Sequence, residues 1–315
     1  MSPTAFVFPG QGSHYVGMGK DLADAFPVAR DTFRQADDIL GFGLSHLCFE
    51  GPEDELRDTI NQQPALLTTS IALWRVLVAS GVPLQPAFVA GHSLGEYSAL
   101  VVAGALDFAD ALRLVRERGR VMKEAGQTHP GAMAAVLGLD DETLEAVCHE
   151  ATTRQGGMGV VCANYNSPGQ VVISGEVAAL DMAGVLAKER GARRVIPLAV
   201  SIASHSPLMK EAAEAFAMSV SAVPLHAPQI PVVANVTARP LSSVADIRNE
   251  MVTQLTSPVR WTASVQYMVA QGVTLLVEVG PKDVLTGLNR RIDATLTATS
   301  IGDTAGIARF IAGGT

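Results

Sequence analysis

Hydrophobic runs of strand length alternate with longer segments of helical periodicity over the first 126 residues. The run TAFVF, which leads into the turn PGQG, predicts a short buried strand. A long apolar helix is predicted over QPALLTTSIALWRVLVAS, ending at Gly81, and a second strand over PAFVAGHS, with a helix directly behind it. A further helix is expected from Asp107, which can cap it, to Gly126. Strands that alternate with helices in this way indicate an α/β layer around a parallel sheet.

The order of the predicted elements changes between residues 127 and 199. There the segments follow one another as strand, helix, two strands, helix and strand, which is the ferredoxin-like order. We therefore expect a ferredoxin-like subdomain at 127–199, inserted into a large domain formed by residues 1–126 and 200–315. In the second part of the large domain we expect helices near 207–221, 243–256 and 262–272, and strands near 231–235 and 274–279.

The composition narrows the class of protein. With 315 residues, 48% of them hydrophobic and 17% charged, the chain can form one large domain and an inserted small one. The net charge of −8 argues against a general nucleic-acid binder. The N-terminal residues lack a secretory leader, and no apolar run reaches the roughly 18 residues that a membrane span needs. Three cysteines without metal-binding spacing predict reduced thiols, so we expect a cytoplasmic protein.

The segment VAGHSLGEY places Ser93 between two glycines, after a predicted strand and before a predicted helix. The pattern G-x-S-x-G in this position is typical of a nucleophile elbow, whose tight turn lifts the hydroxyl clear of the sheet. The helix N-terminus behind it favours developing negative charge. A serine that only caps the helix is the alternative. The strand before Ser93 and the helix after it favour the nucleophile.

A nucleophilic serine needs a base, and the chain has seven histidines. His92 adjoins Ser93 and is expected to point the opposite way, so we expect it to pack locally. His14, in the glycine-rich loop after the first strand, could line the site. His205, in SIASHSPLM, lies where the chain leaves the small subdomain, and clefts form at such junctions. Spacing alone favours His205 over the polar-segment histidines, which are His46, His129, His149 and His226.

An oxyanion hole requires N–H donors close to the nucleophile. The backbone amide of Leu94, which follows Ser93, is one natural donor. The segment PGQG places Gln11 at the end of the first predicted strand, where its amide could supply a second. An ordinary turn is the alternative for that segment.

Arg118 lies on the same face of its predicted helix as three apolar residues, Leu112, Val115 and Met122. Its guanidinium must either extend to the surface or find a partner inside. If the guanidinium points into a cleft, its planar donors suit a carboxylate. The periodicity leaves both alternatives open.

Seven motifs in order along the chain resemble the malonyl-CoA:acyl-carrier-protein transacylases. They are FVFPGQGS, QPALLT, GHSLGEYSAL, NYNSPGQVVISG, SHSPLM, QLTSPVRWTASVQYM and VEVGPKDVLTGLNRRI, and they extend over nearly the whole chain. Several motifs in sequence are far more specific than any one of them. The resemblance implies an α/β-hydrolase-like large domain and a ferredoxin-like insert, in agreement with the predicted order of elements.

The resemblance also implies roles for individual residues. Ser93 matches the acylated nucleophile and His205 its general base. Gln11 and Leu94 match the two residues whose backbone amides form the oxyanion hole. Gln254 matches the residue whose backbone carbonyl orients the histidine. The site would then be a Ser–His dyad supported by a carbonyl group, without a third acid.

Four further positions match residues of the substrate cleft. Arg118 matches the arginine that holds the malonyl carboxylate, and Gln63 and Asn166 match polar residues that line the cleft. Ser204 lies before the histidine, where many malonyl-specific polyketide domains carry phenylalanine. In this family, serine at that position occurs in free-standing transacylases that use malonyl and in methylmalonyl-using polyketide domains. The resemblance therefore implies malonyl as the acyl group, and the small side chain leaves room for an α-methyl branch.

The implied reaction is a ping-pong transfer of malonyl from malonyl-CoA to the phosphopantetheine thiol of an acidic acyl carrier protein, in fatty-acid or polyketide synthesis. It requires no metal or redox cofactor, and the expected enzyme is a monomer. Carrier docking would use a basic surface. The candidates are Lys188, Arg190, Arg193 and Arg194 on the small subdomain, and Lys210, Lys282, Arg290 and Arg291 on the large domain.

A serine hydrolase or thioesterase is the alternative, since it shares the elbow, the base and the oxyanion hole but passes the acyl group to water. Hydrolases of this fold usually use an acid between the serine and the histidine in sequence. The acidic residues between Ser93 and His205 fall mostly at helix starts or on solvated faces. A non-catalytic scaffold is disfavoured because every proposed catalytic position is occupied by a suitable residue.

Overall fold

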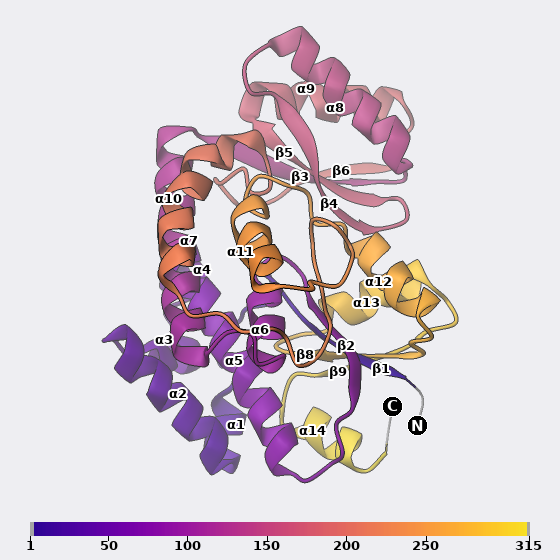
Figure 1. Cartoon of the computed structure of the whole chain (residues 1–315). Coiled ribbons are helices and arrows are strands. Elements are labelled where there is room, and N and C mark those ends of the chain that lie inside the picture. The colour runs from indigo at the N-terminus through magenta and orange to yellow at the C-terminus, as the bar shows by residue number, and fades with distance from the viewer. Residues whose placement is uncertain (1–2, 314–315) are drawn as a thin grey trace.

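The chain folds around two β-sheets that share no strand (Figure 1). The computed structural model describes residues 3–313. The first sheet has the order β7-β2-β1-β8-β9, and all its neighbouring strands are parallel. Its strands are β1 (Thr4–Phe8), β2 (Pro86–Gly91), β7 (Val232–Val233), β8 (Leu275–Val279) and β9 (Thr297–Ile301). The predicted α/β fold with a parallel sheet is confirmed.

Helices cover both faces of the parallel sheet because its strands are apolar on both sides. Along β1, Phe6 and Phe8 pack on the face covered by α5 and α6, whereas Ala5 and Val7 pack on the face covered by α12 and α13. The helices of this part are α1 (Lys20–Ala25), α2 (Pro27–Leu40), α3 (Leu44–Glu50), α4 (Glu53–Arg57), α5 (Thr59–Ala79), α6 (Gly95–Val102), α7 (Phe108–Thr128), α10 (Lys210–Ala222), α11 (Val244–Thr253), α12 (Trp261–Ala270), α13 (Val284–Ile292) and α14 (Thr304–Ile311).

The second sheet is antiparallel and has the order β4-β5-β3-β6. It consists of β3 (Gly131–Leu137), β4 (Val160–Ser167), β5 (Gln170–Glu176) and β6 (Arg194–Pro197). Helices α8 (Asp141–Gln155) and α9 (Val177–Glu189) pack on its face away from the large sheet (Figure 1). These elements lie within the predicted insert 127–199, whose limits stay a prediction.

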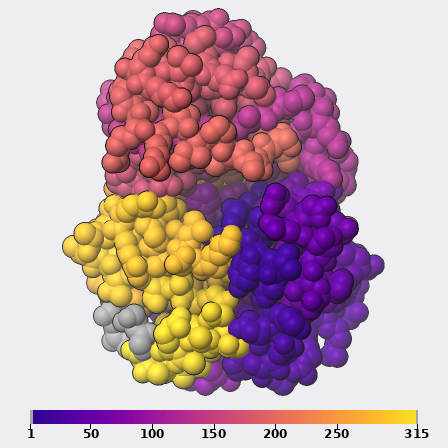
Figure 2. Space-filling model, turned by 180° about the vertical axis from the view of Figure 1, so that it is seen from behind, coloured from indigo at the N-terminus to yellow at the C-terminus, as the bar shows by residue number. Residues whose placement is uncertain are grey.

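The two parts are joined by backbone hydrogen bonds as well as by the chain. The amide of Tyr165 in β4 donates to the carbonyl of Val259, 2.9 Å away, and the amide of Val259 donates to the carbonyl of Ala163 at 2.9 Å. In the space-filling view, the segments of the antiparallel sheet lie above the indigo N-terminal and the yellow C-terminal segments (Figure 2). Residues from both ends of the chain therefore meet beneath the small sheet.

Helix α7 differs from its predicted limits. It continues to Thr128, two residues beyond the predicted end at Gly126. A Cβ atom at Gly126 would lie 2.9 Å from the side chain of Ile202, so this glycine permits close packing inside the helix instead of ending it. Asp107 occupies the N-cap position as predicted, but its side chain makes no capping hydrogen bond.

Candidate active site

Ser93 lies in a tight turn between β2 and α6, with a φ of +50°. A Cβ atom on Gly91 would lie 1.9 Å from the backbone carbon of Gly95, and one on Gly95 would lie 2.0 Å from the carbonyl oxygen of Phe8. Only glycine fits either position, because α6 begins directly against β1 and β2. The strand, turn and helix around Ser93 thus have the arrangement expected of a nucleophile elbow.

The structure brings Ser93 and His205 together although they are far apart in sequence. His205 Nε2 lies 2.8 Å from Ser93 Oγ. On the other side of the ring, Nδ1 lies 2.8 Å from the carbonyl oxygen of Gln254 and 3.2 Å from that of Ser257. Because both carbonyl oxygens are acceptors, the ring proton lies on Nδ1 and the Ser93 hydroxyl donates to Nε2. The predicted Gln254 carbonyl is in place, and that of Ser257 was not predicted.

His205 is neutral at ordinary pH. Burial, followed by the positive charge of Arg118, lowers the pKa of the ring to about 3. A neutral imidazole whose Nε2 faces a hydroxyl can take its proton. The dyad therefore has the protonation state that a general base requires.

The Arg118 side chain is fully buried and points toward Ser93 rather than to the surface. Its Nη1 donates to Gln63 Oε1 at 2.9 Å, and its Nη2 donates to Gln254 Oε1 at 3.0 Å and to Ser93 Oγ at 3.2 Å. Within residues 3–313 the guanidinium forms no ion pair with an acidic side chain, and its Nε has no hydrogen-bond partner. A buried cation beside a nucleophile is suited to an anionic group on the substrate.

The PGQG loop lies directly against the elbow. A Cβ atom on Gly10 would be 2.4 Å from the carbonyl oxygen of His92. Over residues 3–313, the backbone amides of Gln11 and Leu94 donate to no other backbone group in the turns and loops. The amide of Ser93, by contrast, donates to Asn235 Oδ1 at 2.6 Å. The two predicted amides are thus open to an oxyanion, and that of Ser93 is occupied.

The remaining predicted cleft residues take different positions. Gln63 is buried and holds Arg118, as described above. Asn166 accepts a hydrogen bond from His92 Nε2 at 2.8 Å, so His92 packs locally, as expected, and does not face Ser93 as a base. Ser204 is half-buried next to His205. His14 lies beside Gln62, 2.8 Å from its Nε2.

Comparison with known proteins agrees with this geometry. The model of the acyl transferase domain family matches residues 5–305. The chain belongs to this acyl transferase family. It is 50% identical over 308 residues to the malonyl CoA-acyl carrier protein transacylase of Escherichia coli K12, with 98% of each chain covered.

Solved structures of the family superpose closely on this acyl transferase. A type II polyketide-synthase acyl-carrier protein in complex with its malonyl-transacylase gives a TM-score of 0.96 at 48% identity, covering 99% of this chain and 100% of the other. An acyl carrier protein S-malonyltransferase from Vibrio cholerae gives 0.95 at 48% identity, covering 98% and 100%. In the part of the acyl transferase that the structure describes, no helix is both long and apolar enough to cross a bilayer.

The sequence did not predict two buried residues that contact this site. Asn235 follows the short strand β7 and binds the Ser93 amide and the Gly91 carbonyl, and Glu96 lies three residues after Ser93 on α6. A polar residue at the carboxyl end of a parallel strand was a signal that could have identified Asn235, since ligand sites form there.

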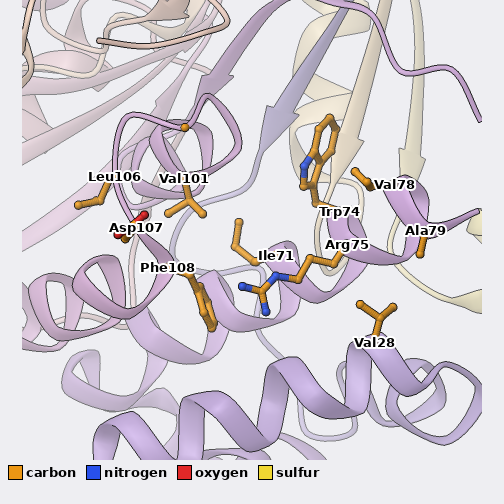
Figure 3. Close-up of a pocket in the computed structure, with 11 residues that line it drawn as sticks. Val28, Ile71, Trp74, Arg75, Val78, Ala79, Val101, Leu106, Asp107 and Phe108 are labelled. Atoms are coloured by element: carbon orange, nitrogen blue, oxygen red, sulfur yellow. The ribbon is translucent and has the colours of Figure 1, made fainter. Parts of the chain in front are cut away.

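A pocket of about 480 Å³ lies apart from this site. It is found among α2, α5 and the start of α7 (Figure 3). Apolar side chains such as Ile71, Trp74 and Phe108 line it, and Arg75 stacks over the Phe108 ring at 4.7 Å. None of the residues around Ser93 lines this pocket, and it offers no nucleophile.

Arg118→Ala is expected to shift the pH dependence of Ser93 acylation in the acyl transferase. Removing the guanidinium removes one of the causes that lower the pKa of His205, so the pKa rises. The acid limb of acylation then moves to higher pH, by on the order of one pH unit. The measurement is CoA release from acetyl-CoA, which has no carboxylate for Arg118 to bind, at pH values where circular dichroism shows folded protein. Arg118→Lys keeps the positive charge, so its acid limb of acylation is expected to lie at the same pH as that of the wild-type protein. An unshifted limb in Arg118→Ala would contradict the electrostatic account.

Proposed function

We propose that this chain transfers a malonyl group from malonyl-CoA to the phosphopantetheine thiol of an acyl carrier protein, through an ester on Ser93. The proposal rests on one observation above all, the Arg118 guanidinium 3.2 Å from the Ser93 hydroxyl, buried without an acidic partner among residues 3–313. A buried positive charge at that distance selects an acyl group that ends in a carboxylate. The names of the relatives agree with that acyl group.

In the first half-reaction, His205 Nε2 takes the proton of Ser93 as Oγ attacks the thioester carbon of malonyl-CoA. The amides of Gln11 and Leu94 donate to the oxyanion that forms. The carbonyl of Gln254 stabilises the imidazolium by accepting from Nδ1. The C–S bond then breaks, and CoA leaves as a thiol with the proton from His205. The malonyl group remains as an ester on Ser93, with its carboxylate on Arg118.

In the second half-reaction, the phosphopantetheine thiol takes the place of CoA. His205 removes the thiol proton, the sulfur attacks the ester carbon, and the proton returns to Ser93 as its C–O bond breaks. These steps exchange a thioester for an ester and back, and they call for neither a metal ion nor a redox cofactor. We also propose a cytoplasmic location, on the three free and buried thiols of Cys48, Cys148 and Cys162.

The hydrolase alternative fits the site less well. The base is oriented by two carbonyl groups, and the nearby buried acid Glu96 binds Asn235 and Gln254 instead of the His205 ring. A transfer assay with a panel of acyl-CoAs and a holo carrier protein tests the proposal. Malonyl is expected to reach the carrier thiol far faster than acetyl. Free acid as the main product would support the hydrolase instead.

We further propose that the carrier protein docks on a groove that we call the arginine groove. It has a volume of about 380 Å³ and is lined by Arg193 just before β6, Arg194 at the start of β6 and Arg291 at the end of α13. All three arginines are exposed, and none pairs with an acidic residue within residues 3–313. Four of the other basic candidates, in contrast, already bind another group. Arg190 pairs with Glu150 and Lys210 with Glu214, whereas Lys282 donates to the Gly12 carbonyl and Arg290 to the Ala298 carbonyl. Unpaired cations at a concave surface suit an acidic partner.

Reversing charge in the arginine groove is expected to weaken carrier binding. Arg194→Glu and Arg291→Glu should each raise the KM for the carrier roughly three- to tenfold and leave acylation by malonyl-CoA unchanged, because a docking charge acts only in the second half-reaction. Arg154→Glu, which makes the same charge change on α8 at an arginine paired with Glu150, is the control. Groove variants that match this control would show that the carrier docks elsewhere.

A further inference from the structure

A buried carboxylate lies behind the nucleophile and contacts none of the reacting groups. Glu96 is 1% exposed and accepts three hydrogen bonds. Its Oε1 accepts from the backbone amide of Asn235 at 2.8 Å and from Asn235 Nδ2 at 3.0 Å, and its Oε2 accepts from Gln254 Nε2 at 2.5 Å. It forms no ion pair with a basic residue within residues 3–313. Side-chain amides of two other residues thus provide much of its stabilisation.

Each of those amides has a second end that reaches the active site. Asn235 Oδ1 accepts from the Ser93 amide at 2.6 Å, and Asn235 Nδ2 also donates to the Gly91 carbonyl at 2.6 Å. Gln254 Oε1 accepts from Arg118 Nη2 at 3.0 Å, and its Nε2 also donates to the Ser93 carbonyl at 3.1 Å. One carboxylate therefore connects, through two amides, to the backbone of the nucleophile and to the arginine.

The chemistry of the carboxylate decides which way the amides point. The oxygens of Glu96 accept in all three of these hydrogen bonds, whereas a side-chain amide has one donor end and one acceptor end. Because Glu96 accepts from both NH₂ groups, the oxygen of Asn235 must face Ser93 and the oxygen of Gln254 must face Arg118. A flipped amide would direct NH₂ at the Ser93 amide or at the guanidinium, placing donor against donor.

A second buried carboxyl lies close to Glu96 and acts on it electrostatically. Glu250 is 3% exposed and accepts from the Val236 amide at 2.9 Å. Burial raises the pKa of both carboxyls, and the charge of Glu250 raises the pKa of Glu96 further, well above its usual range. The hydrogen bonds that Glu96 accepts from the Asn235 amide and from Gln254 oppose this rise in its pKa.

We propose that Glu96 is a positioning residue, whose accepting carboxyl oxygens fix Asn235 and Gln254 in the orientations that hold Ser93 and Arg118. This proposal rests on the proposed acyl transfer. The two branches have different effects. The Asn235 branch sets the nucleophile and acts on every acyl group, whereas the Gln254 branch sets the arginine and acts on acyl groups that carry a carboxylate.

Glu96→Gln tests the proposal because glutamine keeps the size of the side chain but turns one acceptor into a donor. The rate of Ser93 acylation, measured as initial CoA release per folded protein, is expected to fall roughly ten- to a hundredfold with acetyl-CoA. With malonyl-CoA it falls further, because Arg118 is also released. Unchanged acylation with both substrates would overturn the proposal.

Exchanging the two side chains provides a rescue. In Glu96→Gln/Gln254→Glu, glutamine at 96 can donate to glutamate at 254 and accept from Asn235, which restores the nucleophile. We expect acetyl-CoA acylation to recover severalfold over Glu96→Gln, a partial recovery because the bond to the Ser93 carbonyl is lost. Malonyl-CoA acylation stays low, since the glutamate at 254 now pairs with Arg118. Failure of the acetyl-CoA reaction to recover would contradict the proposed orientation.

Three further variants separate positioning from general destabilisation. Glu278→Gln removes another buried carboxylate, which binds Leu285 and Thr286 away from the site. Because this variant changes only the stability of the fold, its rate of Ser93 acylation per folded protein is expected to stay within about twofold of wild type. If Glu96→Gln does not fold, Asn235→Ala and Gln254→Ala test the branches singly. Asn235→Ala should slow Ser93 acylation by both substrates in equal proportion. Gln254→Ala should slow acylation by malonyl-CoA more than acylation by acetyl-CoA.

The opposite pattern in these two variants, or an equal loss in Glu278→Gln, would refute the positioning role. Transfer by the wild-type protein tests the proposed function independently. A failure of the positioning role is therefore distinguishable from a failure of the reaction itself.

Discussion

Arg118→Ala is expected to lower kcat/KM for malonyl-CoA by roughly a hundredfold to a thousandfold, while acetyl-CoA loses much less. Truncating one partner of a buried, hydrogen-bonded charge pair costs about 2–5 kcal/mol, which corresponds to this range. Acetyl has no carboxylate, so its loss reflects only the changed surroundings of Ser93. The measurement is CoA release per folded protein with each substrate, fitted for kcat and KM separately.

Arg118→Lys provides the matched control for this prediction. Lysine keeps a positive charge but lacks the planar pair of donors, so it should recover part of the malonyl preference. Equal losses for malonyl-CoA and acetyl-CoA in Arg118→Ala would mean that the arginine is a structural residue. The selectivity of the site would then have to come from other side chains.

Ser93→Ala is expected to abolish covalent labelling by malonyl-CoA and to lower transfer by a factor on the order of 10⁴ or more. In the proposed reaction the Ser93 hydroxyl forms the ester, and His205 Nε2, 2.8 Å away, takes its proton. Labelling is measured as the mass of intact protein after incubation with malonyl-CoA and located by peptide mapping.

A neighbouring serine serves as the control for labelling. Ser98 lies on α6, is buried like Ser93, and is expected to be replaceable by alanine without loss of the label. A malonyl group that persists in Ser93→Ala, or that maps to another residue of the wild-type protein, would show that the nucleophile has been misassigned.

The tight turn around Ser93 was predictable because its signal is local. A strand, two glycines and a helix follow one another within a few residues, and the packing of Gly91 and Gly95 explains both glycines. The element order also predicted both sheets. Helices α1 to α4 were not predicted, and three of them, α1, α3 and α4, are only one or two turns long, too short for helical periodicity to be visible.

The surroundings of Ser93 were harder to predict from the sequence because they depend on tertiary contacts. Helical spacing placed Arg118 on an apolar face, but it could not distinguish a side chain that extends to solvent from one that lines a cleft. Asn235 reaches the elbow only through the fold, from a segment 142 residues further along the chain. A local pattern cannot indicate such pairings, and a family resemblance indicates only the positions whose roles are known.

The most direct test of the account follows the fate of the ester on Ser93. Malonyl-enzyme is freed of excess malonyl-CoA and then incubated either in buffer or with a holo carrier protein, and the mass of each protein is followed with time. The account predicts that the ester persists in buffer, and that with the carrier it is lost rapidly as the malonyl group appears on the phosphopantetheine thiol. Loss at the same rate in both samples, with free malonate as the product, would contradict it.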